Sequence, residues 1–168
     1  MEPRSLTPGG RVAYPYAVIT DLDRVVELVR EGDLLVLSGA GLSTESGIPD
    51  YRGPTGRQRE SSPIQYREYV SSAEARRRYW ARSAVGWPFV RAAQPNAGHR
   101  AVAAMEHAGL VHGVITQNVD GLHHVAGSRA VVELHGSLAS VVCLSCGTSE
   151  SRDQLQQRMI RANPGWDL

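Results

Sequence analysis

Apolar and polar positions alternate along the chain in two different periods. Leu22, Val25, Val26 and Val29 recur on one face of a predicted helix over residues 20–30. The apolar run at 34–37, bounded by glycines, is typical of a buried strand. The same patterns then predict helices at 97–107 and 122–126 and strands at 110–116 and 130–134. Strands separated by helices in this order indicate an α/β fold with a parallel, doubly wound sheet.

Residues 53–94 interrupt this pattern with a long insertion. From residue 52 to residue 82 there are eight arginines and three acids, interleaved with tyrosine and tryptophan. We expect a small helical subdomain, with a helix opened by Ser71 and Glu74 and broken at Gly86-Trp87-Pro88. Its basic and aromatic side chains leave three interpretations open: a nucleic-acid surface, a solvated helix face, or a patch for an acidic acyl chain.

Composition narrows the possible functions. The net charge of +1 gives no electrostatic footprint for nucleic acid, and no segment has the length and apolarity of a membrane span. All eighteen basic residues are arginine, which excludes a Walker-type phosphate loop and a Schiff-base lysine. Cys143 and Cys146 lie three apart, which favours metal or redox chemistry in a reducing compartment. Residues 1–16 lack the apolar core of a secretory signal, so a cytoplasmic protein is expected.

A glycine-rich turn follows the first predicted strand. Between Gly39 and Gly41, backbone N–H groups can approach a phosphate without interference from Cβ atoms. The spacing is not the ordinary dinucleotide fingerprint, because the next glycine is Gly47. An acid, an aromatic residue and an arginine follow at 50–52, a combination that can hold a polar ring, cover it and pair with an anion. The alternative is an ordinary strand–loop–helix corner.

Polar residues also end the other two predicted strands. Gln117, Asn118 and Asp120 offer amide and carboxylate groups that suit ribose hydroxyls and a carboxamide. His135 follows the third strand, where an imidazole can act as a general base for a ribose hydroxyl. The alternative is a histidine that only caps a backbone carbonyl group. For the other histidines of the chain a structural role is the simpler interpretation.

Five ordered motifs give the sequence a family resemblance. They are Gly39 to Arg52, Pro95-Asn96-Ala97-Gly98-His99, Thr116 to His123, Leu134-His135-Gly136 and Cys143-Leu144-Ser145-Cys146. In this order they resemble the sirtuin family of NAD-dependent protein deacylases. The run from Tyr79 to Pro88, and a tyrosine at position 51, resemble the subclass that includes a mitochondrial vertebrate member.

The resemblance implies a role for each matching residue. The implied NAD-binding positions are Gly39, Ala40, Gly41, Ser43, Ile48, Asp50, Tyr51, Arg52, Gln117, Asn118 and Asp120. The three residues of the turn would cradle the pyrophosphate. Ser43, Gln117 and Asn118 would hold the reactive ribose, and Ile48 and Asp120 the nicotinamide carboxamide.

Catalysis and metal binding are implied in the same way. Tyr51 would cover the ribose and Arg52 would order the cofactor loop, while His135, Asn118 and Asp120 form the implied catalytic group. The acyl oxygen of a modified lysine would attack the ribose carbon, with His135 as general base. Cys143 and Cys146 would be two of the four ligands of one zinc ion, and two ligands do not make a tetrahedral site.

The expected organisation is therefore an incomplete Rossmann-like sheet with additions. We expect an arm at 1–19, an NAD-binding portion at 20–52 and 95–138, the insertion at 53–94, and a partial zinc ribbon at 139–168. The expected protein is a monomeric NAD-dependent deacylase of acylated lysine side chains, with possible ADP-ribosyl transfer, that binds neither nucleic acid nor membrane. Because the resemblance covers only the first part of a sirtuin, the alternative is a non-catalytic module for NAD or ADP-ribose, or an inactive fragment.

Overall fold

The computed structural model describes residues 22–50, 53 and 64–166, and it divides the chain into two units at Gly32. Helix α1 (Leu22–Glu31) belongs to the first unit and confirms the predicted helix. Gly32 ends it with a positive φ of 75°, a backbone angle that glycine adopts without a Cβ penalty. Everything that follows lies in the second unit, Asp33–Leu168.

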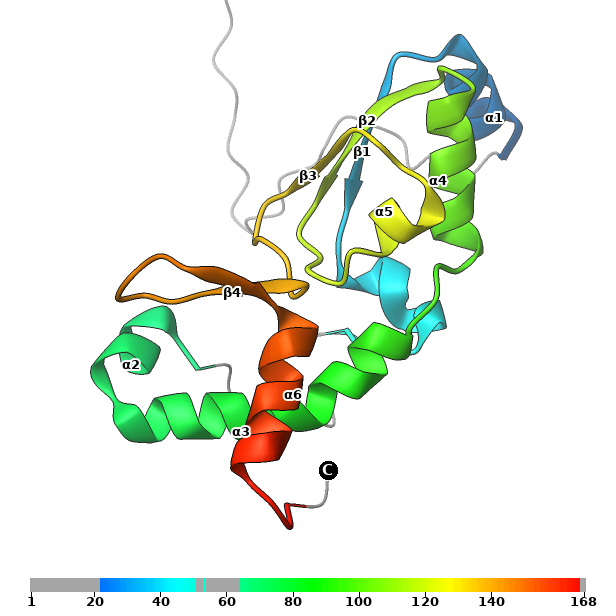
Figure 1. The fold of residues 1–168 in the computed structure, drawn as a ribbon. Helices are drawn as coiled ribbons and strands as arrows, with labels where there is room; N and C mark the ends of the chain where they lie inside the picture. The colour runs from blue at the N-terminus through cyan, green and yellow to red at the C-terminus, as the bar shows by residue number, and fades with distance from the viewer. Residues whose placement is uncertain (1–21, 51–52, 54–63, 167–168) are drawn as a thin grey trace, which may run out of the picture. The chain divides into compact units, whose positions relative to one another are not determined.

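The second unit contains a parallel three-stranded sheet (Figure 1). Its strands are β1 (Leu34–Ser38), β2 (Val111–Thr116) and β3 (Val131–Glu133), in the order β1-β2-β3. This confirms the predicted α/β fold with a Rossmann-like parallel sheet. In the register, Ser38 pairs with Thr116 and Thr116 with Glu133, so all three strands end at the same edge.

Short helices connect and cover the strands. A 3₁₀ helix, η1 (Ala40–Ser46), follows β1, and α5 (Leu122–Ala126) follows β2. Helix α4 (Ala97–His107) packs against β2 and α5, and Asn96 caps it as expected. The buried apolar side chains of this layer are Val102, Ala103, Val111, Val114 and Leu122. Among the described residues, no helix is both long and apolar enough to cross a membrane.

The insertion contains α2 (Tyr66–Ser71) and the long helix α3 (Ala73–Ala92), and two details of its prediction are wrong. The cap of α3 is Ser72, whose hydroxyl accepts a hydrogen bond from the Ala75 backbone N–H. Ser71 instead ends α2, and its hydroxyl donates to the carbonyl of Arg67 one turn earlier. The predicted break at Gly86-Trp87-Pro88 is absent, because α3 continues through Pro88 to Ala92.

Helix α6 (Arg152–Ala162) explains why Pro88 does not break α3. A proline inside a helix has no N–H for the carbonyl group four residues earlier, here that of Ala84. The side chain of Gln156 donates a hydrogen bond to this carbonyl oxygen at 2.9 Å, and Gln156 is buried. A side chain of α6 therefore replaces the backbone donor that Pro88 lacks.

Arg152 strengthens the same contact between the two helices. Its guanidinium donates to the carbonyl and hydroxyl oxygens of Ser83 and to Oε1 of Gln156. It also lies near the rings of Trp80 and Trp87, at 5.8 and 5.1 Å from their centroids. Burial lowers the pKa of Arg152, but the hydrogen bonds and the aromatic faces compensate part of the lost hydration.

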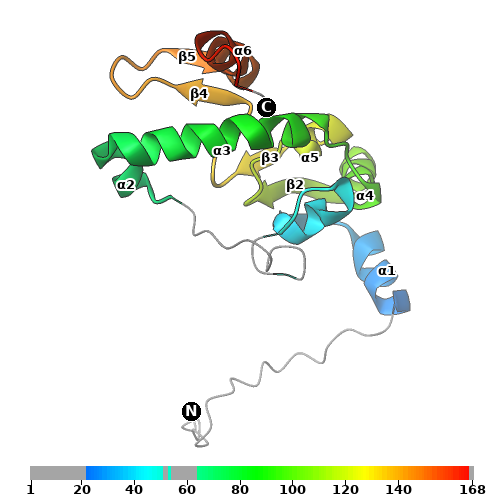
Figure 2. The ribbon, with the colours of Figure 1, turned by 90° about the horizontal axis from the view of Figure 1, so that it is seen from below.

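An antiparallel hairpin precedes α6. Strands β4 (Ser140–Val142) and β5 (Ser149–Ser151) pair with each other, and the turn between them carries both cysteines. Figure 2 shows the hairpin beside α6, which packs on α3. Arg152 donates its backbone N–H to the carbonyl of Ala139, so the hairpin and α6 are joined at their bases.

We predict that Gln156→Ala lowers the free energy of unfolding by about 1–3 kcal/mol, because it leaves the buried Ala84 carbonyl without a donor. Gln157→Ala changes an exposed neighbour on the same helix and should stay within about 0.5 kcal/mol. Urea denaturation followed by circular dichroism measures both. Equal effects of the two substitutions would contradict the role given to Gln156.

Candidate functional site

Asn118 joins two strand ends at the edge where the sheet's carboxyl ends meet. Its side-chain amide donates to the carbonyl of Gly39 and to the hydroxyl of Ser43, both at 3.1 Å. Its backbone N–H donates to the hydroxyl of Thr116 at 3.1 Å. Asn118 is buried, so these bonds hold the glycine turn of β1 against the end of β2.

Ser43, which is buried, and Asp120, which is half-buried, complete this cluster. The hydroxyl of Ser43, which is 1% exposed, donates to Oδ2 of Asp120 at 2.7 Å. The other carboxylate oxygen accepts the backbone N–H of Leu122 at the start of α5. The structure thus brings together three predicted site residues, Ser43, Asn118 and Asp120, in one chain of hydrogen bonds.

His135 lies at the same edge and is exposed. Its Nδ1 is 3.0 Å from the backbone carbonyl oxygen of Gln117. A carbonyl oxygen can only accept, so Nδ1 carries the proton and Nε2 of the neutral ring keeps its lone pair. His135 therefore does cap a carbonyl, as the simpler interpretation held, yet this bond also orients the ring and leaves Nε2 as a base.

The glycine turn leaves open space above its backbone. A Cβ atom built at Gly39 or Gly41 would have no atom of another described residue within 4 Å apart from its chain neighbours, so the space beside these glycines could take a ligand. Ala40 lies between them at the start of η1. Gly47, with φ of 83°, ends η1, and Ile48 then donates its backbone N–H to the carbonyl of Ser43.

Asn96 supports the turn from a second direction. Its side-chain amide donates to the carbonyl of Leu42 at 2.6 Å and to the hydroxyl of Ser46 at 3.1 Å. The same side chain caps α4 through its oxygen. The η1 segment is consequently held at one side by Asn118 and at the other by Asn96.

Two contributors were missed in the sequence, Ser38 and Thr116. The hydroxyl of Ser38 donates to that of Thr116 at 2.8 Å, and this pair lies beneath Asn118. Each of these hydroxyl residues ends an apolar strand, and this position in the sequence could have indicated their role.

The remaining predicted residues are less closely connected to this cluster. Gln117 is exposed beside His135. The carboxylate of Asp50 lies over Gly53, where a Cβ atom would be 1.6 Å from Oδ2. Tyr51 and Arg52 lie outside the described residues.

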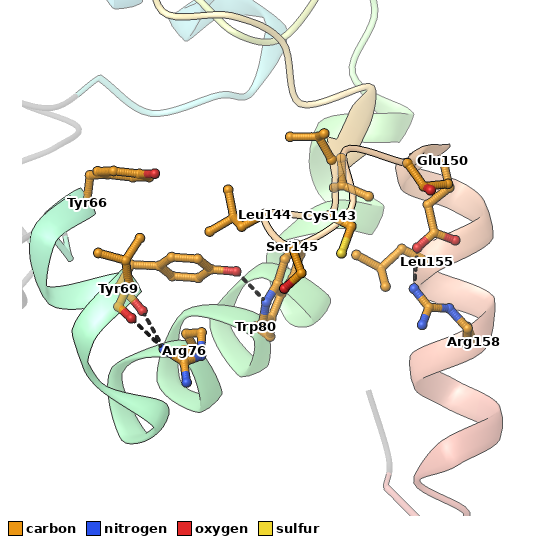
Figure 3. A pocket seen from close by; sticks show the side chains of 14 residues that line it. Tyr66, Tyr69, Arg76, Trp80, Cys143, Leu144, Ser145, Glu150, Leu155 and Arg158 are labelled. Carbon is orange, nitrogen blue, oxygen red and sulfur yellow. Dashed lines mark hydrogen bonds and ion pairs between the residues drawn. The ribbon is translucent and has the colours of Figure 1, made fainter.

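Two of the cavities among the described residues each reach a predicted site residue, Ile48 in one and Cys143 in the other. A cavity of about 640 Å³ is lined by Ile48 and by Tyr79, Arg82, Val119 and Leu138. A larger one, of about 930 Å³, lies between the hairpin and α2 and α3, away from His135 and Asn118. Figure 3 shows Cys143 and Leu144 of the hairpin in this larger cavity, together with Tyr69 and Trp80. We assign the chemistry to the strand ends, because the polar groups converge there.

Cys143 and Cys146 are both exposed and reduced. The pKa of Cys146 is lowered to about 7 by hydrogen bonds with the hydroxyl and the backbone of Thr148 and with the Cys143 thiol. Cys143 also accepts the Gly147 backbone N–H at its carbonyl, which closes a tight turn. Two neighbouring thiols of this kind fit one half of a zinc site, but the described residues contain no group of three or more potential ligands.

Fold and site together define an α/β protein with a hydrogen-bonded polar cluster at the carboxyl edge of a parallel sheet, beside a glycine turn. Comparison with known proteins is more specific, because the Sir2 family profile matches residues 39–165. The chain belongs to the Sir2 family.

Several relatives are close in sequence. "NAD-dependent protein deacetylase 1" of Streptomyces coelicolor is 58% identical over 147 residues, which are 88% of this chain and 49% of that protein. "NAD-dependent protein deacylase SIR4" of Batrachochytrium dendrobatidis is 50% identical over 139 residues, 79% of this chain and 46% of that protein. The chain thus spans about half the length of these relatives.

Solved structures share the fold. The structure described as "Sir2-p53 peptide-NAD+" superimposes with a TM-score of 0.72 at 34% identity, over 83% of this chain and 55% of that one. The family resemblance inferred from the five motifs is therefore confirmed.

We predict that Ser43→Ala lowers the free energy of unfolding by about 1–3 kcal/mol, because it removes a partner from the buried amide of Asn118 and from Asp120. Glu45→Ala, an exposed change in the same 3₁₀ helix, should cost no more than about 0.5 kcal/mol. Thermal and urea unfolding compare the two. If Ser43→Ala is as mild as Glu45→Ala, the cluster does not hold the turn.

Proposed function

We propose that this chain carries the catalytic residues of an NAD-dependent deacylase that acts on acylated lysine side chains. Nicotinamide would be released and the acyl group transferred to ADP-ribose. The observation that carries the proposal is the convergence of the Ser43–Asn118–Asp120 cluster, the open glycine turn and the free Nε2 of His135 at one sheet edge. The names of the relatives in Streptomyces and Batrachochytrium support it.

The groups at this edge suit NAD. Gly39, Ala40 and Gly41 would lie against the pyrophosphate, since the space beside the glycines is open. Asn118 and Ser43 would position the reactive ribose, with Gln117 at another hydroxyl. Both amide hydrogens of Asn118 are already used within the protein, so its side-chain orientation is fixed before any ligand binds.

Residues of the loop after η1 would complete the cofactor site. Ile48 and Asp120 would bind the nicotinamide carboxamide, while Asp50, Tyr51 and Arg52 would order the loop and cover the ribose. NAD, when bound, supplies a ribose carbon from which nicotinamide leaves.

His135 would hold and move the proton. Nε2 would accept a proton from a ribose hydroxyl after the acyl oxygen of the lysine substrate has attacked the ribose carbon. The bond between Nδ1 and the Gln117 carbonyl orients the ring and fixes its tautomer, so that Nε2 keeps its lone pair. Transfer of ADP-ribose to another nucleophile is a possible side reaction of the same site.

A second candidate function is binding of NAD or ADP-ribose without turnover. It is favoured by one observation, namely that the chain spans about half the length of the relatives with the named activity. A cytoplasmic location and a monomeric state remain predictions from the sequence.

The test separates binding from chemistry. Calorimetry with ADP-ribose should show binding by the 168-residue chain, and a nicotinamide-release assay with an acetylated peptide should detect turnover. A chimera in which the second half of the Streptomyces relative follows Gly165 is assayed in parallel. If both proteins bind ADP-ribose but neither releases nicotinamide, the second candidate is favoured. If the chimera shows neither binding nor turnover, the proposed deacylase function is overturned.

His135→Ala provides the sharper prediction. It should reduce deacylation by about 10²–10⁴-fold, because general-base catalysis is lost, while ADP-ribose binding stays within a few fold. Asp120→Asn should instead weaken cofactor binding and nicotinamide release together. His112→Ala, a change at an exposed histidine paired with Asp33, is the control and should leave both unchanged. Near-normal turnover in His135→Ala would make the histidine structural.

We also propose that Cys143 and Cys146 bind zinc together with two further cysteines of the kind the family resemblance implies. The 168-residue chain should then lose zinc to a mild chelator, whereas the chimera should retain one ion per chain, because half of the ligands contribute little of the binding free energy. Metal analysis after dialysis measures this, with Cys146→Ser as the negative control. Tightly held zinc in the 168-residue chain would mean that other ligands complete the site.

A further inference from the structure

Two buried histidines lie beneath the cluster, and the proposed reaction uses neither. His99 in the first turn of α4 is 0% exposed, and His123 in α5 is 2% exposed. Their rings meet edge to face, with centroids 5.1 Å apart and an interplanar angle of 65°. One ring nitrogen of each, Nε2 of His99 and Nδ1 of His123, is buried without a partner among the described residues.

The hydrogen bonds of His99 determine its tautomer. Its Nδ1 lies 3.4 Å from the backbone N–H of Asn96, as the reciprocal half of the capping box. A backbone N–H can only donate, so Nδ1 of His99 carries a lone pair. The proton of the ring is therefore on Nε2, the nitrogen without a partner.

His123 is determined by Ser38. Its Nε2 lies 2.8 Å from the Ser38 hydroxyl, and that hydroxyl already donates to Thr116. With the hydroxyl hydrogen of Ser38 directed to Thr116, the Ser38 oxygen accepts from His123, which places the ring proton on Nε2 and a lone pair on Nδ1. The two unpartnered atoms are consequently an N–H on His99 and an acceptor on His123, which are complementary.

We propose that His99 and His123 are paired positioning residues, coupled through one water molecule that bridges the His99 Nε2–H and the His123 Nδ1 lone pair. The pair must be neutral to hold the ligand-binding cluster. His123 fixes the Ser38 hydroxyl, which fixes Thr116, which accepts the backbone N–H of Asn118. The proposal rests on the proposed function, because it assigns the cluster to NAD.

The charges around the pair determine how it responds to pH. Burial lowers the pKa of His99. The charge of Asp120 raises this pKa, and the charge of Arg100 lowers it further. Burial also lowers the pKa of His123. The nearby rings of His99 and His124 lower it further, whereas Asp120 and Glu106 raise it. A proton on Nδ1 of His123 would set an N–H against the N–H of His99, so protonation removes the complementarity on which the pair depends.

The direction of the effect follows from linkage. Above a pH of about 6.5 both rings are neutral in the folded and the unfolded chain, so the pair contributes fully. As the pH falls below this value, the unfolded chain takes up protons that the folded pair excludes. Stability should therefore decrease toward acid pH.

Long-range ¹⁵N–¹H NMR of the full chain tests the tautomers directly. Both buried rings should show the Nε2–H tautomer and remain neutral at pH 6. A proton on Nδ1 of His99, or a charged ring in the pair at pH 7, would overturn the proposal whether or not the chain binds NAD.

Calorimetry with ADP-ribose tests the coupling to the site, in a His135→Ala background so that this exposed ring does not contribute. The equilibrium constant for folding, measured by urea unfolding, should fall by about tenfold from pH 7.5 to pH 5.5 if one proton is taken up by the unfolded chain alone over that range. In the His99→Asn, His123→Gln double variant, the amides can retain the bonds to Asn96 and Ser38 but do not titrate. Its affinity for ADP-ribose should be several-fold lower at pH 7.5, and its equilibrium constant for folding should lose this part of the pH dependence.

His112→Asn is the matched control, since this exposed histidine pairs with Asp33, and it should retain the full pH dependence. Circular dichroism at each pH confirms that the variants are folded. An unchanged acid loss in the double variant would overturn the coupling. If no variant binds ADP-ribose at any pH, the proposed function fails, and the NMR result alone decides whether the pair exists.

Discussion

The parallel register of the three strands is the constraint on which the site depends. Because Ser38, Thr116 and Glu133 are paired across the sheet, the segments that leave the strands begin side by side. Their polar groups are partly buried there and must satisfy one another, since water reaches few of them. Asn118 contributes to this with amide donors to two residues, Gly39 and Ser43, of the segment that leaves the end of β1. A shift of one residue in the register would separate these partners.

Much of the site could be predicted from the sequence because its residues occupy compact motifs at predicted strand ends. Ser43, Asn118 and Asp120 were expected to share a ligand, and the structure joins them by hydrogen bonds. The tautomer of His135 could not be predicted, because it depends on a carbonyl group 18 residues away in the sequence. The pairing of the buried His99 and His123 could not be predicted for the same reason, because a histidine in a helical pattern does not show which groups surround it.

The fold was predictable where local patterns and tertiary contacts agree. The strands and the helices at 97–107 and 122–126 were found at nearly their observed bounds. The prediction failed at Pro88, where a local rule for helix breaking was overridden by a side chain from a distant helix. It failed again at Ser71, since two adjacent serines offer equal caps and only the path of the chain distinguishes them.

The proline in α3 also has a consequence for the order in which the chain can assemble. Ala84 and its donor Gln156 are 72 residues apart, so the first half of α3 can form locally while its passage through Pro88 lacks a donor. During synthesis from the N-terminus, that section leaves the ribosome well before α6 exists. The parallel strands and the hairpin must therefore be made before the insertion can reach its final form. Assembly of this helix is a late event, although its sequence comes early.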